Sequence, residues 1–446
     1  MTTPPPSADW LARWRETNSD IARLSFTHRM ADAVIDEQRG RDIRIGDQWL
    51  ADFASCNYLG FDLDQEILDA IPEYLAKWGS HPSWSRIIAS PVLYEQIEEQ
   101  LAELCGTEDA LTLPTITHIH FSVLPVLAAG GTVFLDSRSH KTLFDGATAA
   151  KATGADVKTI GHNNLDRLQA RLEAGDWKRP GVIALDGVNS MTGNLPDLVE
   201  YARLAREHDA ILYVDDAHGF GVIGERDPDE LSPYGTRGNA IVRHLGESYD
   251  NVVLIGALSK AYSSLMAFLA VPTELKTLLK STAPPYVYSG PSPVASLATV
   301  LEGLRVNRER GDEIRKVLHD RTKRILDTID ELSLDAVNDS GLPIIQVPLA
   351  DPDRVSEVGD MLFERGLYVT MCPYPIVPRR EAGFRIQVTA ANGEEHIDRL
   401  VSALHELQDL FRRRDDPQAL AHPKRFARTT PRRPTDRARS RVIPPR

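Results

Sequence analysis

Residues 181–221 read GVIALDGVNSMTGNLPDLVEYARLAREHDAILYVDDAHGFG. The two ends of this stretch, GVIALD (181–186) and AILYVD (210–215), are apolar up to their last residue and short, as buried β-strands are. Between them, apolar side chains recur at the spacing of one helix face: Leu198, Tyr201, Ala202 and Ala205. A buried strand, a helix and a second buried strand predict one repeating unit of a parallel sheet.

The same alternation continues on both sides of this unit. Three more short apolar runs are predicted to be strands: TVFLD (132–136), VKTIG (157–161) and NVVLIG (251–256). A helix over 91–105, ended by Gly106, precedes them. Because strands that are apolar throughout need helices on both faces, we expect a large α/β domain over residues 60–295 with a mostly parallel central sheet.

The remaining segments predict a smaller domain and an N-terminal arm. Residues 1–59 are interpreted as a helical arm and a small-domain segment, with a hairpin, IRIGDQW, that turns at Gly46-Asp47. Residues 296–413 predict an α+β domain with a long polar helix over 310–332. Its other predicted elements are the strands PIIQVPL (343–349), LYVTM (367–371) and FRIQV (384–388), a helix ending at Gly366 and a final helix over 393–413.

Charge divides the chain into an acidic body and a basic tail. The whole chain has 51 Lys and Arg against 64 Asp and Glu, a net charge of −13. From Arg412 to the end there are 12 Lys and Arg against 3 Asp, so this end carries +9 and the body −22. An acidic body argues against nucleic acid as the main partner. The Arg- and Pro-rich tail (414–446) is predicted to be disordered, as a solvated appendage or as a docking arm for an acidic partner or nucleic acid.

Residues 252–272 form the one apolar run long enough to cross a bilayer. Lys260 near its middle would cost a membrane span at least a few kcal/mol. We therefore predict a buried strand, a turn and the start of a helix, with Lys260 facing a cavity. The cysteines are too far apart to indicate a disulfide framework or a zinc site: Cys56, Cys105 and Cys372. No metal centre is expected, and without a visible export signal we expect a cytoplasmic protein.

Polar groups follow three of the predicted strands. Asp136 to His140, Asp215 to His218 and Ser259-Lys260 each come directly after a strand. Taken singly, they could be a helix cap, a loop histidine and a surface lysine. Because ligands bind beyond the carboxyl ends of parallel strands, we expect them to form one site. A lysine in an apolar crevice has a lowered pKa and attacks carbonyls, and a carboxylate keeps the ring nitrogen of pyridoxal phosphate (PLP) protonated. This combination points to PLP.

Six segments carry a resemblance to a known family. They are FASCNYLGF (53–61), LDSRSHKTLFDGA (135–147), LDGVNSMTGNLPDL (185–198), VDDAHGFGVIG (214–224), ALSKAYS (257–263) and VPRREAGFRIQVTAANGEEHIDRL (377–400). In order and approximate spacing they resemble the α-oxoamine synthases among the fold-type I PLP enzymes, which include 8-amino-7-oxononanoate synthase and serine palmitoyltransferase. The resemblance runs from about Phe53 to Leu404 and implies the fold-type I architecture.

The resemblance also implies roles for individual residues. Lys260 would form the Schiff base with PLP and act as general base. Asp215 would pair with the pyridinium nitrogen, and His218 would bond the ring oxygen and assist catalysis. His140 would stack on the ring, and Ser190 would lie near the cofactor. Arg385 would grip the amino-acid carboxylate, although on local sequence alone it could be a surface arginine on an edge strand.

The implied reaction joins a small amino acid to an acyl thioester, on coenzyme A or an acyl carrier protein, with loss of carbon dioxide. The family resemblance further implies a homodimer with its site at the subunit interface. Ser289 and Gly290 of YSGPSP (288–293) would reach the neighbour's phosphate. Two alternatives stay open: another PLP enzyme acting on amino acids (an aminotransferase, decarboxylase or aldolase-type lyase), and a catalytically silent partner subunit.

Several residues depart from the family pattern around phosphate and substrate. LPTITHIH (113–120) replaces a Gly-rich segment, so Thr115, Ile116 and Thr117 are the candidate phosphate ligands. Ala257 replaces a hydroxyl residue that commonly grips the phosphate, which Ser263, Ser264 or the partner subunit could offset. Cys56 and Asn57 stand where substrate-side residues are expected. These departures predict a specialised, biosynthetic substrate that differs from those of the named enzymes.

Overall fold

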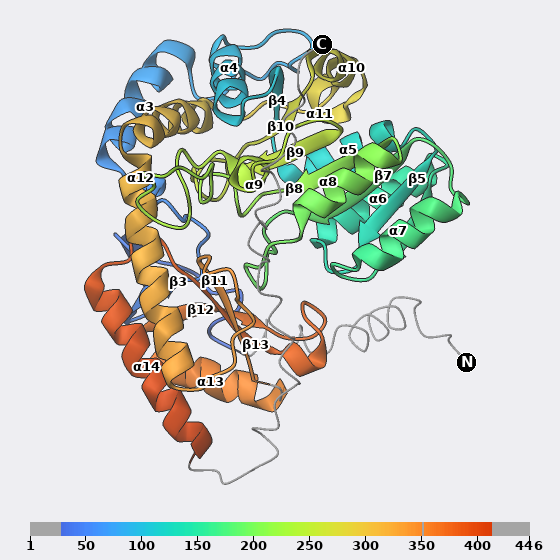
Figure 1. Ribbon diagram of the computed structural model, residues 1–446. Helices are drawn as coiled ribbons and strands as arrows, with labels where there is room; N and C mark the ends of the chain where they lie inside the picture. The colour runs from blue at the N-terminus through green and yellow to red at the C-terminus, as the bar shows by residue number, and fades with distance from the viewer. Residues whose placement is uncertain (1–27, 350–351, 413–446) are drawn as a thin grey trace, which may run out of the picture.

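The computed structural model describes residues 28–349 and 352–412. The helical arm expected before His28 and the basic tail (414–446) lie outside the described residues. The described chain forms a seven-stranded and a six-stranded sheet. The long helix α12 (Val294–Glu331) runs from the part of the chain with the first sheet to the part with the second (Figure 1).

The seven-stranded sheet holds the predicted α/β core. Its strand order is β4-β10-β9-β8-β7-β5-β6, and its strands are β4 (Asp109–Leu113), β5 (Thr132–Asp136), β6 (Asp156–Ile160), β7 (Gly181–Asp186), β8 (Ala210–Asp215), β9 (Val252–Ala257) and β10 (Ala267–Val271). The five strands predicted from apolar runs are all confirmed, and neighbouring members of this set are parallel. The helix expected after Lys260 is wrong: the chain returns as β10, antiparallel to β9 and β4.

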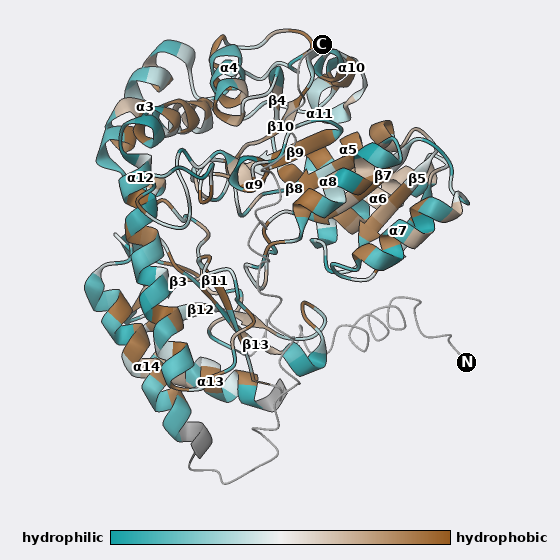
Figure 2. Cartoon of the chain, viewed as in Figure 1, coloured by the Kyte–Doolittle hydropathy of each residue, from teal (hydrophilic) through white to brown (hydrophobic). Residues whose placement is uncertain are grey.

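Two adjacent buried strands explain why residues 252–272 look like a membrane span. Both β9 and β10 are buried along their whole length, and Figure 2 shows the hydrophobic colour gathered around β8 and β9. Within the described residues no helix is both long and apolar enough to cross a membrane.

Helices cover the seven-stranded sheet and the outer side of α12. They are α3 (Gln65–Trp78), α4 (Leu93–Cys105), α5 (Ile116–Ala128), α6 (Lys141–Ala152), α7 (Leu165–Ala174), α8 (Leu198–Glu207), α9 (Ala240–His244), α10 (Thr273–Thr282) and α11 (Pro284–Val287). Alternate residues of β8 enter different cores: Leu212 and Val214 pack with α8, whereas Tyr213 packs with α5. Covering both faces hides every residue of such a strand from water, which accounts for its apolar sequence.

The six-stranded sheet joins the N-terminal and C-terminal parts of the chain. Its order is β1-β2-β3-β12-β13-β11, with β1 (Glu37–Arg39), β2 (Asp42–Ile45), β3 (Gln48–Phe53), β11 (Ile344–Pro348), β12 (Leu367–Cys372) and β13 (Gly383–Gln387). The hairpin turn at Gly46-Asp47 is as predicted, because Ile45 pairs with Gln48. The helices α13 (Pro352–Glu364) and α14 (Glu394–Arg412) complete this part.

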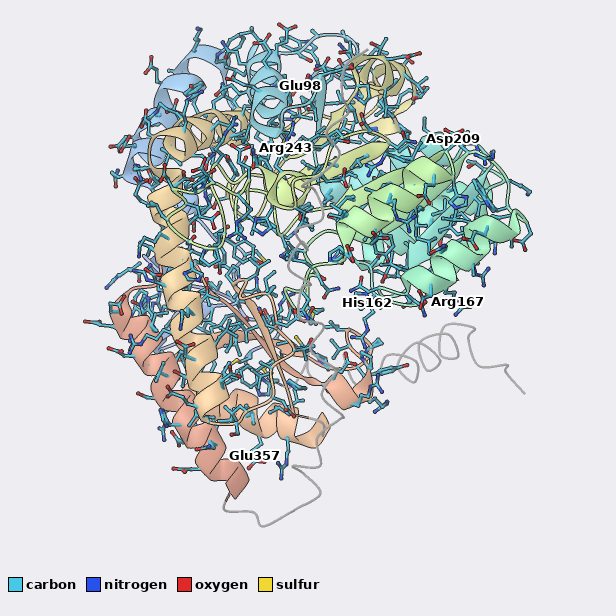
Figure 3. The ribbon with its side chains drawn as sticks, viewed as in Figure 1. Glu98, His162, Arg167, Asp209, Arg243 and Glu357 are labelled. Atoms are coloured by element: carbon cyan, nitrogen blue, oxygen red, sulfur yellow. The ribbon has the colours of Figure 1, made fainter. Side chains whose placement is uncertain are left out.

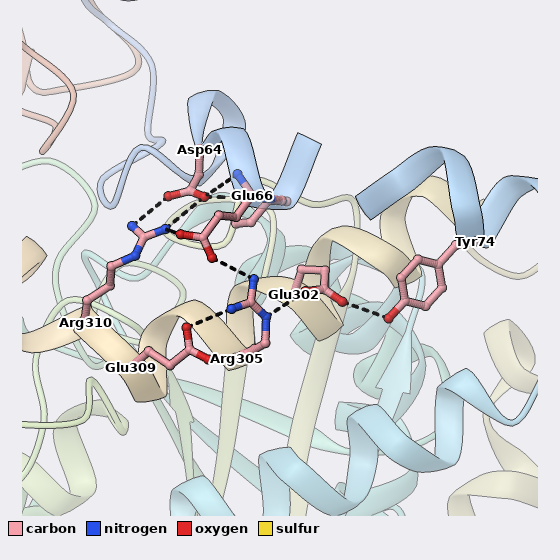
Figure 4. A network of polar contacts seen from close by, with 8 residues as sticks. Asp64, Glu66, Tyr74, Glu302, Arg305, Glu309 and Arg310 are labelled. Carbon is pink, nitrogen blue, oxygen red and sulfur yellow. Dashed lines mark hydrogen bonds and ion pairs between the residues drawn. The ribbon is translucent and has the colours of Figure 1, made fainter. Parts of the chain in front are cut away.

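Helix α12 is longer than the 310–332 segment predicted for it. It begins at Val294 and changes direction at Arg310, whose φ of −150° is not helical. Arg310 binds both carboxylate oxygens of Asp64, the residue that caps α3, at 2.9 and 3.1 Å. Neighbouring ion pairs continue this network between α3 and α12 (Figure 4). Only the polar second half of α12 was predicted from the sequence. The first half, which packs against α3 and α4, was missed.

Candidate active site

The carboxyl ends of the parallel strands bring the predicted polar residues together. Asp186 and Asp215 are register partners at the ends of β7 and β8. Lys260 lies in the loop between β9 and β10, and its charge acts on Asp215, His218 and His140. Lys260 is half-buried, so the apolar enclosure expected around its amine is incomplete in this chain.

Asp215 is held as an anion at the base of the site. Its Oδ1 accepts the Ala217 N–H at 3.1 Å, and its Oδ2 is 2.9 Å from His120 Nε2. Burial by itself would raise the pKa of Asp215, but His120 and Lys260 outweigh burial and lower that pKa. Such a fixed negative charge can keep a pyridine nitrogen protonated.

His120 was not predicted from the sequence. It lies on α5, is completely buried and contacts Asp215 through one ring nitrogen and Tyr213 through the other. It stands in the quoted segment LPTITHIH, but the face of α5 that it occupies depends on how this helix packs on the sheet.

The pKa of Asp186 shifts in the opposite direction to that of Asp215. Its Oδ1 accepts the His140 N–H at 2.9 Å, whereas its buried Oδ2 has no hydrogen-bond partner within the described chain. Burial, followed by repulsion from Asp215, raises the pKa of Asp186 well above its ordinary value. Asp186 therefore holds a proton more tightly than Asp215 does.

His218 is a buried, neutral imidazole. Burial and the positive charges of Lys260 and Arg385 lower its pKa well below the usual value. Its Nδ1 is 2.8 Å from the hydroxyl of Tyr58, a fully buried residue whose own pKa is raised by burial. When Tyr58 donates to Nδ1, the Nε2–H of His218 is free to donate to a ligand. Tyr58 stands in the quoted NYLG motif, but its partner could not be predicted.

The polar residues after β5, Asp136 to His140, have separate roles. His140 is exposed and caps α6, with its Nδ1 2.8 Å from Thr142 Oγ1. Asp136 instead accepts hydrogen bonds from the His162 ring at 3.0 Å and from the Asn163 N–H at 2.9 Å. His162 is labelled in Figure 3. Asp136 therefore organises the loop before α7 and contributes no free carboxylate to the site.

The N-terminus of α5 is a suitable place for a phosphate. Thr115 caps this helix, and Thr115, Ile116 and Thr117 form its first turn. Ser263 adds a buried Oγ for which the described chain supplies no hydrogen-bond partner. Ser264 is different because its Oγ donates to the Ser296 carbonyl at 2.7 Å. Of the two serines proposed to offset Ala257, Ser263 is thus the free one.

Arg385 connects the six-stranded sheet to the loop after β7. It lies on β13, between β12 and β11, so the alternative of an edge-strand arginine is wrong. Its Nη1 donates to the Ser190 carbonyl at 2.5 Å, while its buried Nε finds no partner in the described residues. Ser190 and Arg385, predicted separately, are therefore in contact.

Four further predicted residues have contacts of their own. Cys56 contacts the Gln387 amide, and the Asn57 amide donates to Asp62 at 2.9 Å. Ser289 donates to the carbonyl of its neighbour Gly290 in a turn after α11. No hydrogen bond among the described residues links Ser289 or Gly290 to Lys260 or Asp215. The roles of these four residues stay predictions.

Comparison with known proteins identifies the family. Residues 50–404 match the family model described as aminotransferase class I and II. The chain belongs to that family. An 8-amino-7-oxononanoate synthase from Dechloromonas aromatica is 30% identical over 391 residues, covering 87% of this chain and 97% of that protein. Another from Ectopseudomonas mendocina is 32% identical over 376 residues, covering 84% and 92%. These relatives confirm the predicted α-oxoamine synthase group.

The fold comparison agrees with this family. A serine palmitoyltransferase from S. paucimobilis, solved with a PLP–myriocin aldimine, superimposes with a TM-score of 0.77 at 22% identity, covering 91% of this chain and 97% of that one. The predicted fold class is confirmed by this superposition, and the predicted enzyme class and PLP dependence are confirmed by the family match.

The residues of this α-oxoamine synthase fit PLP. Asp215 offers an anion for the ring nitrogen, His218 a donor, Lys260 an amine, and α5 with Ser263 a phosphate site. A separate open cavity of about 670 Å³ lies beside β2, β3 and α13, lined by residues such as Trp49, and none of the predicted site residues lines it. No cluster of three or more His, Cys, Asp or Glu side chains in the described ranges could hold a metal.

Proposed function

We propose that this synthase condenses a small amino acid with an acyl thioester, releasing carbon dioxide and an α-aminoketone. The observation that carries the proposal is the set of opposed charge states at the strand ends. Asp215 is anionic, His218 is neutral, and the charge of Lys260 acts on both groups. PLP, when bound, supplies the electron sink that makes an amino-acid α-carbon acidic.

Each protein group has a defined task in this reaction. The Lys260 amine binds the cofactor and, once released, accepts the α-proton. Asp215 keeps the ring nitrogen protonated. The Nε2–H of His218 donates to the ring oxygen or to the incoming carbonyl oxygen, and a proton-transfer group of this kind contributes about 10²–10⁴-fold.

Arg385 is proposed to bind the substrate carboxylate. Its Nη1 is held by the Ser190 carbonyl, which leaves the Nε for a carboxylate oxygen. Cys56 and Asn57 occupy the substrate side in the family pattern, and their departure from it supports a specialised substrate. Coenzyme A and an acyl carrier protein are both possible carriers of the acyl group.

The enzyme is proposed to be a homodimer with its site at the interface. Exposed apolar side chains support a covered surface here: Trp84 is 53% exposed, Ile88 74% and Tyr288 83%. Tyr288 directly precedes Ser289 and Gly290, which we propose reach the phosphate of the partner subunit. A cytoplasmic location stays a prediction.

The visible absorbance of the purified protein tests the cofactor and the amino acid together. We expect a yellow PLP absorbance that shifts with one small amino acid, is lost in Lys260→Ala, and persists in the control Lys280→Ala, which removes an exposed lysine of α10. Absorbance that persists in Lys260→Ala would contradict the assigned lysine.

The thioester requirement distinguishes this reaction from the alternatives. An acyl thioester should accelerate exchange of the amino acid's α-proton for solvent deuterium, measured by NMR. If no thioester accelerates exchange or decarboxylation, the enzyme is an aminotransferase, decarboxylase or lyase on the same fold.

A further inference from the structure

We propose that His120 is a positioning residue that clamps the carboxylate of Asp215, the group that would pair with the PLP ring nitrogen, and that Tyr213 fixes the tautomer in which it does so. The inference deepens the proposed function, because it rests on Asp215 serving the ring nitrogen. The clamp determines which of the two acids at this edge of the sheet carries the negative charge.

The geometry follows from the two-residue period of β8. Tyr213 and Asp215 lie two residues apart, so their side chains leave the same face of the sheet. Helix α5 packs on that face and places His120 between them. His120 Nδ1 is 3.0 Å from the Tyr213 hydroxyl, and His120 Nε2 is 2.9 Å from Asp215 Oδ2. Both His120 and Tyr213 are completely buried.

When His120 is the neutral imidazole, the hydrogen-bond chain has one consistent direction. Burial raises the pKa of Tyr213 well above its ordinary value, so this phenol keeps its proton and donates a hydrogen bond to His120 Nδ1. The imidazole then carries its hydrogen on Nε2, and this N–H donates a hydrogen bond to Asp215. Because the Ala217 N–H binds Oδ1, both oxygens of Asp215 are held and the carboxylate cannot rotate.

The clamp also explains the unequal states of Asp215 and Asp186. These two acids are register partners at the same edge. Lys260 acts on both, and His140 contacts Asp186 through its backbone N–H. The distinguishing group is His120, whose Nε2 reaches Asp215 alone. Without this donor, repulsion between two buried carboxylates would favour a shared proton.

Close packing keeps His120 in place. Gly146 of α6 lies against the His120 backbone, and a Cβ built on Gly146 would come within 2.4 Å of the His120 carbonyl oxygen. Helix α5, which carries His120, also carries the proposed phosphate-binding turn at Thr115 and Thr117. Helix α5 therefore sets the distance between the phosphate and the ring-nitrogen end of the site.

Two substitutions of similar polarity separate the clamp from a general packing role. His120→Gln keeps an amide N–H at about the position of Nε2, whereas His120→Asn is too short to reach Asp215. We expect His120→Asn to weaken PLP binding by about 10–100-fold, the range for a lost hydrogen bond to a charged group. His120→Gln should stay within about threefold of the native protein.

The test titrates apoprotein with PLP and follows the quenching of tryptophan fluorescence. The pH midpoint of the bound cofactor's absorbance is then recorded, and it should move in His120→Asn but not in His120→Gln. His244→Asn is the matched control, because His244 lies on α9 and its Nδ1 bonds to the Gly224 carbonyl. This variant should bind PLP like the native protein.

Equal PLP affinity and equal midpoints for His120→Asn and His120→Gln would overturn the clamp. If neither variant folds, Tyr213→Phe decides: weaker PLP binding supports the clamp, and unchanged binding with an unchanged midpoint overturns it. Failure of the proposed function looks different, because the native protein would then bind no PLP or would show no thioester-dependent exchange.

Discussion

Asp186 and Asp215 end adjacent parallel strands as register partners, yet the pKa of Asp186 is raised and the pKa of Asp215 is lowered. Burial acts on both in the same direction. The difference comes from the partners of each carboxyl, since His120 binds Asp215 while one oxygen of Asp186 has no partner in the described chain. A strand pair that looks symmetrical in sequence thus becomes electrostatically asymmetrical.

The acid next to Asp215 should make stability depend on pH. Asp216 is completely buried, and burial raises its pKa from 3.8 to about 7. A raised carboxyl pKa means that the folded state binds a proton more tightly, so this stabilisation is present below about pH 4 and is lost as the pH rises to about 7. The shift corresponds to roughly 4 kcal/mol at most.

Asp216→Asn should remove that dependence. The asparagine oxygen can still accept the Ile241 N–H that Asp216 binds at 2.8 Å, but it carries no charge. Urea unfolding at pH 5 and pH 8 gives the free energy of unfolding of both proteins. Relative to the native protein, the variant should be more stable at pH 8 than it is at pH 5. Parallel curves for the two proteins would show that Asp216 does not titrate in this range.

Tyr58 is predicted to determine which ring nitrogen of His218 carries the hydrogen. Tyr58→Phe removes the hydroxyl that lies 2.8 Å from His218 Nδ1 and leaves a buried ring nitrogen unpaired. We expect a stability loss of about 1–3 kcal/mol and at least a tenfold fall in kcat at unchanged PLP content, because the donor on Nε2 is no longer favoured. Tyr234→Phe, which removes another buried phenol hydroxyl, bonded to the Gly341 carbonyl, is the control. A similar fall in kcat for both variants would argue against tautomer control.

Ser263 is predicted to bind the phosphate. Its buried Oγ has no partner in the described chain, whereas the Oγ of Ser264 is already bonded to the Ser296 carbonyl. Ser263→Ala should therefore weaken PLP binding about tenfold with little change in apoprotein stability. Ser264→Ala should do the reverse, lowering stability by about 1 kcal/mol. Fluorescence titration with PLP and thermal unfolding of the apoproteins measure the two effects.

An ion pair joins the two sheet-bearing parts of the chain. Arg138, after β5, binds Glu381, before β13, through two hydrogen bonds of 2.8 and 2.7 Å. Because the Glu381 side chain is only 14% exposed, Glu381→Gln should cost about 1–2 kcal/mol in chemical unfolding. Glu207→Gln breaks an exposed pair with Arg203 on α8 and should cost less than about 0.5 kcal/mol. Equal costs would mean that the Arg138–Glu381 contact adds nothing specific between the two parts.

The local pattern of residues was sufficient for most of the architecture. Apolar runs marked five strands of the main sheet, and residues at their ends led to Lys260, Asp215 and His218. This succeeds because burial on both faces requires apolar residues along a whole strand. It failed after Lys260, where an apolar run suits a helix as well as a strand and pairing with β9 and β4 makes it β10.

The contacts of the site were beyond the sequence. His120 and Tyr58 lie 95 and 160 positions away from Asp215 and His218, the groups that they bind. A strand residue and a helix residue meet only when the helix is placed on one particular face of the sheet, and local spacing does not contain that choice. The amino-acid order therefore established the fold and the reactive groups, whereas tertiary packing established their charge states, since these depend on neighbours that are distant in the chain.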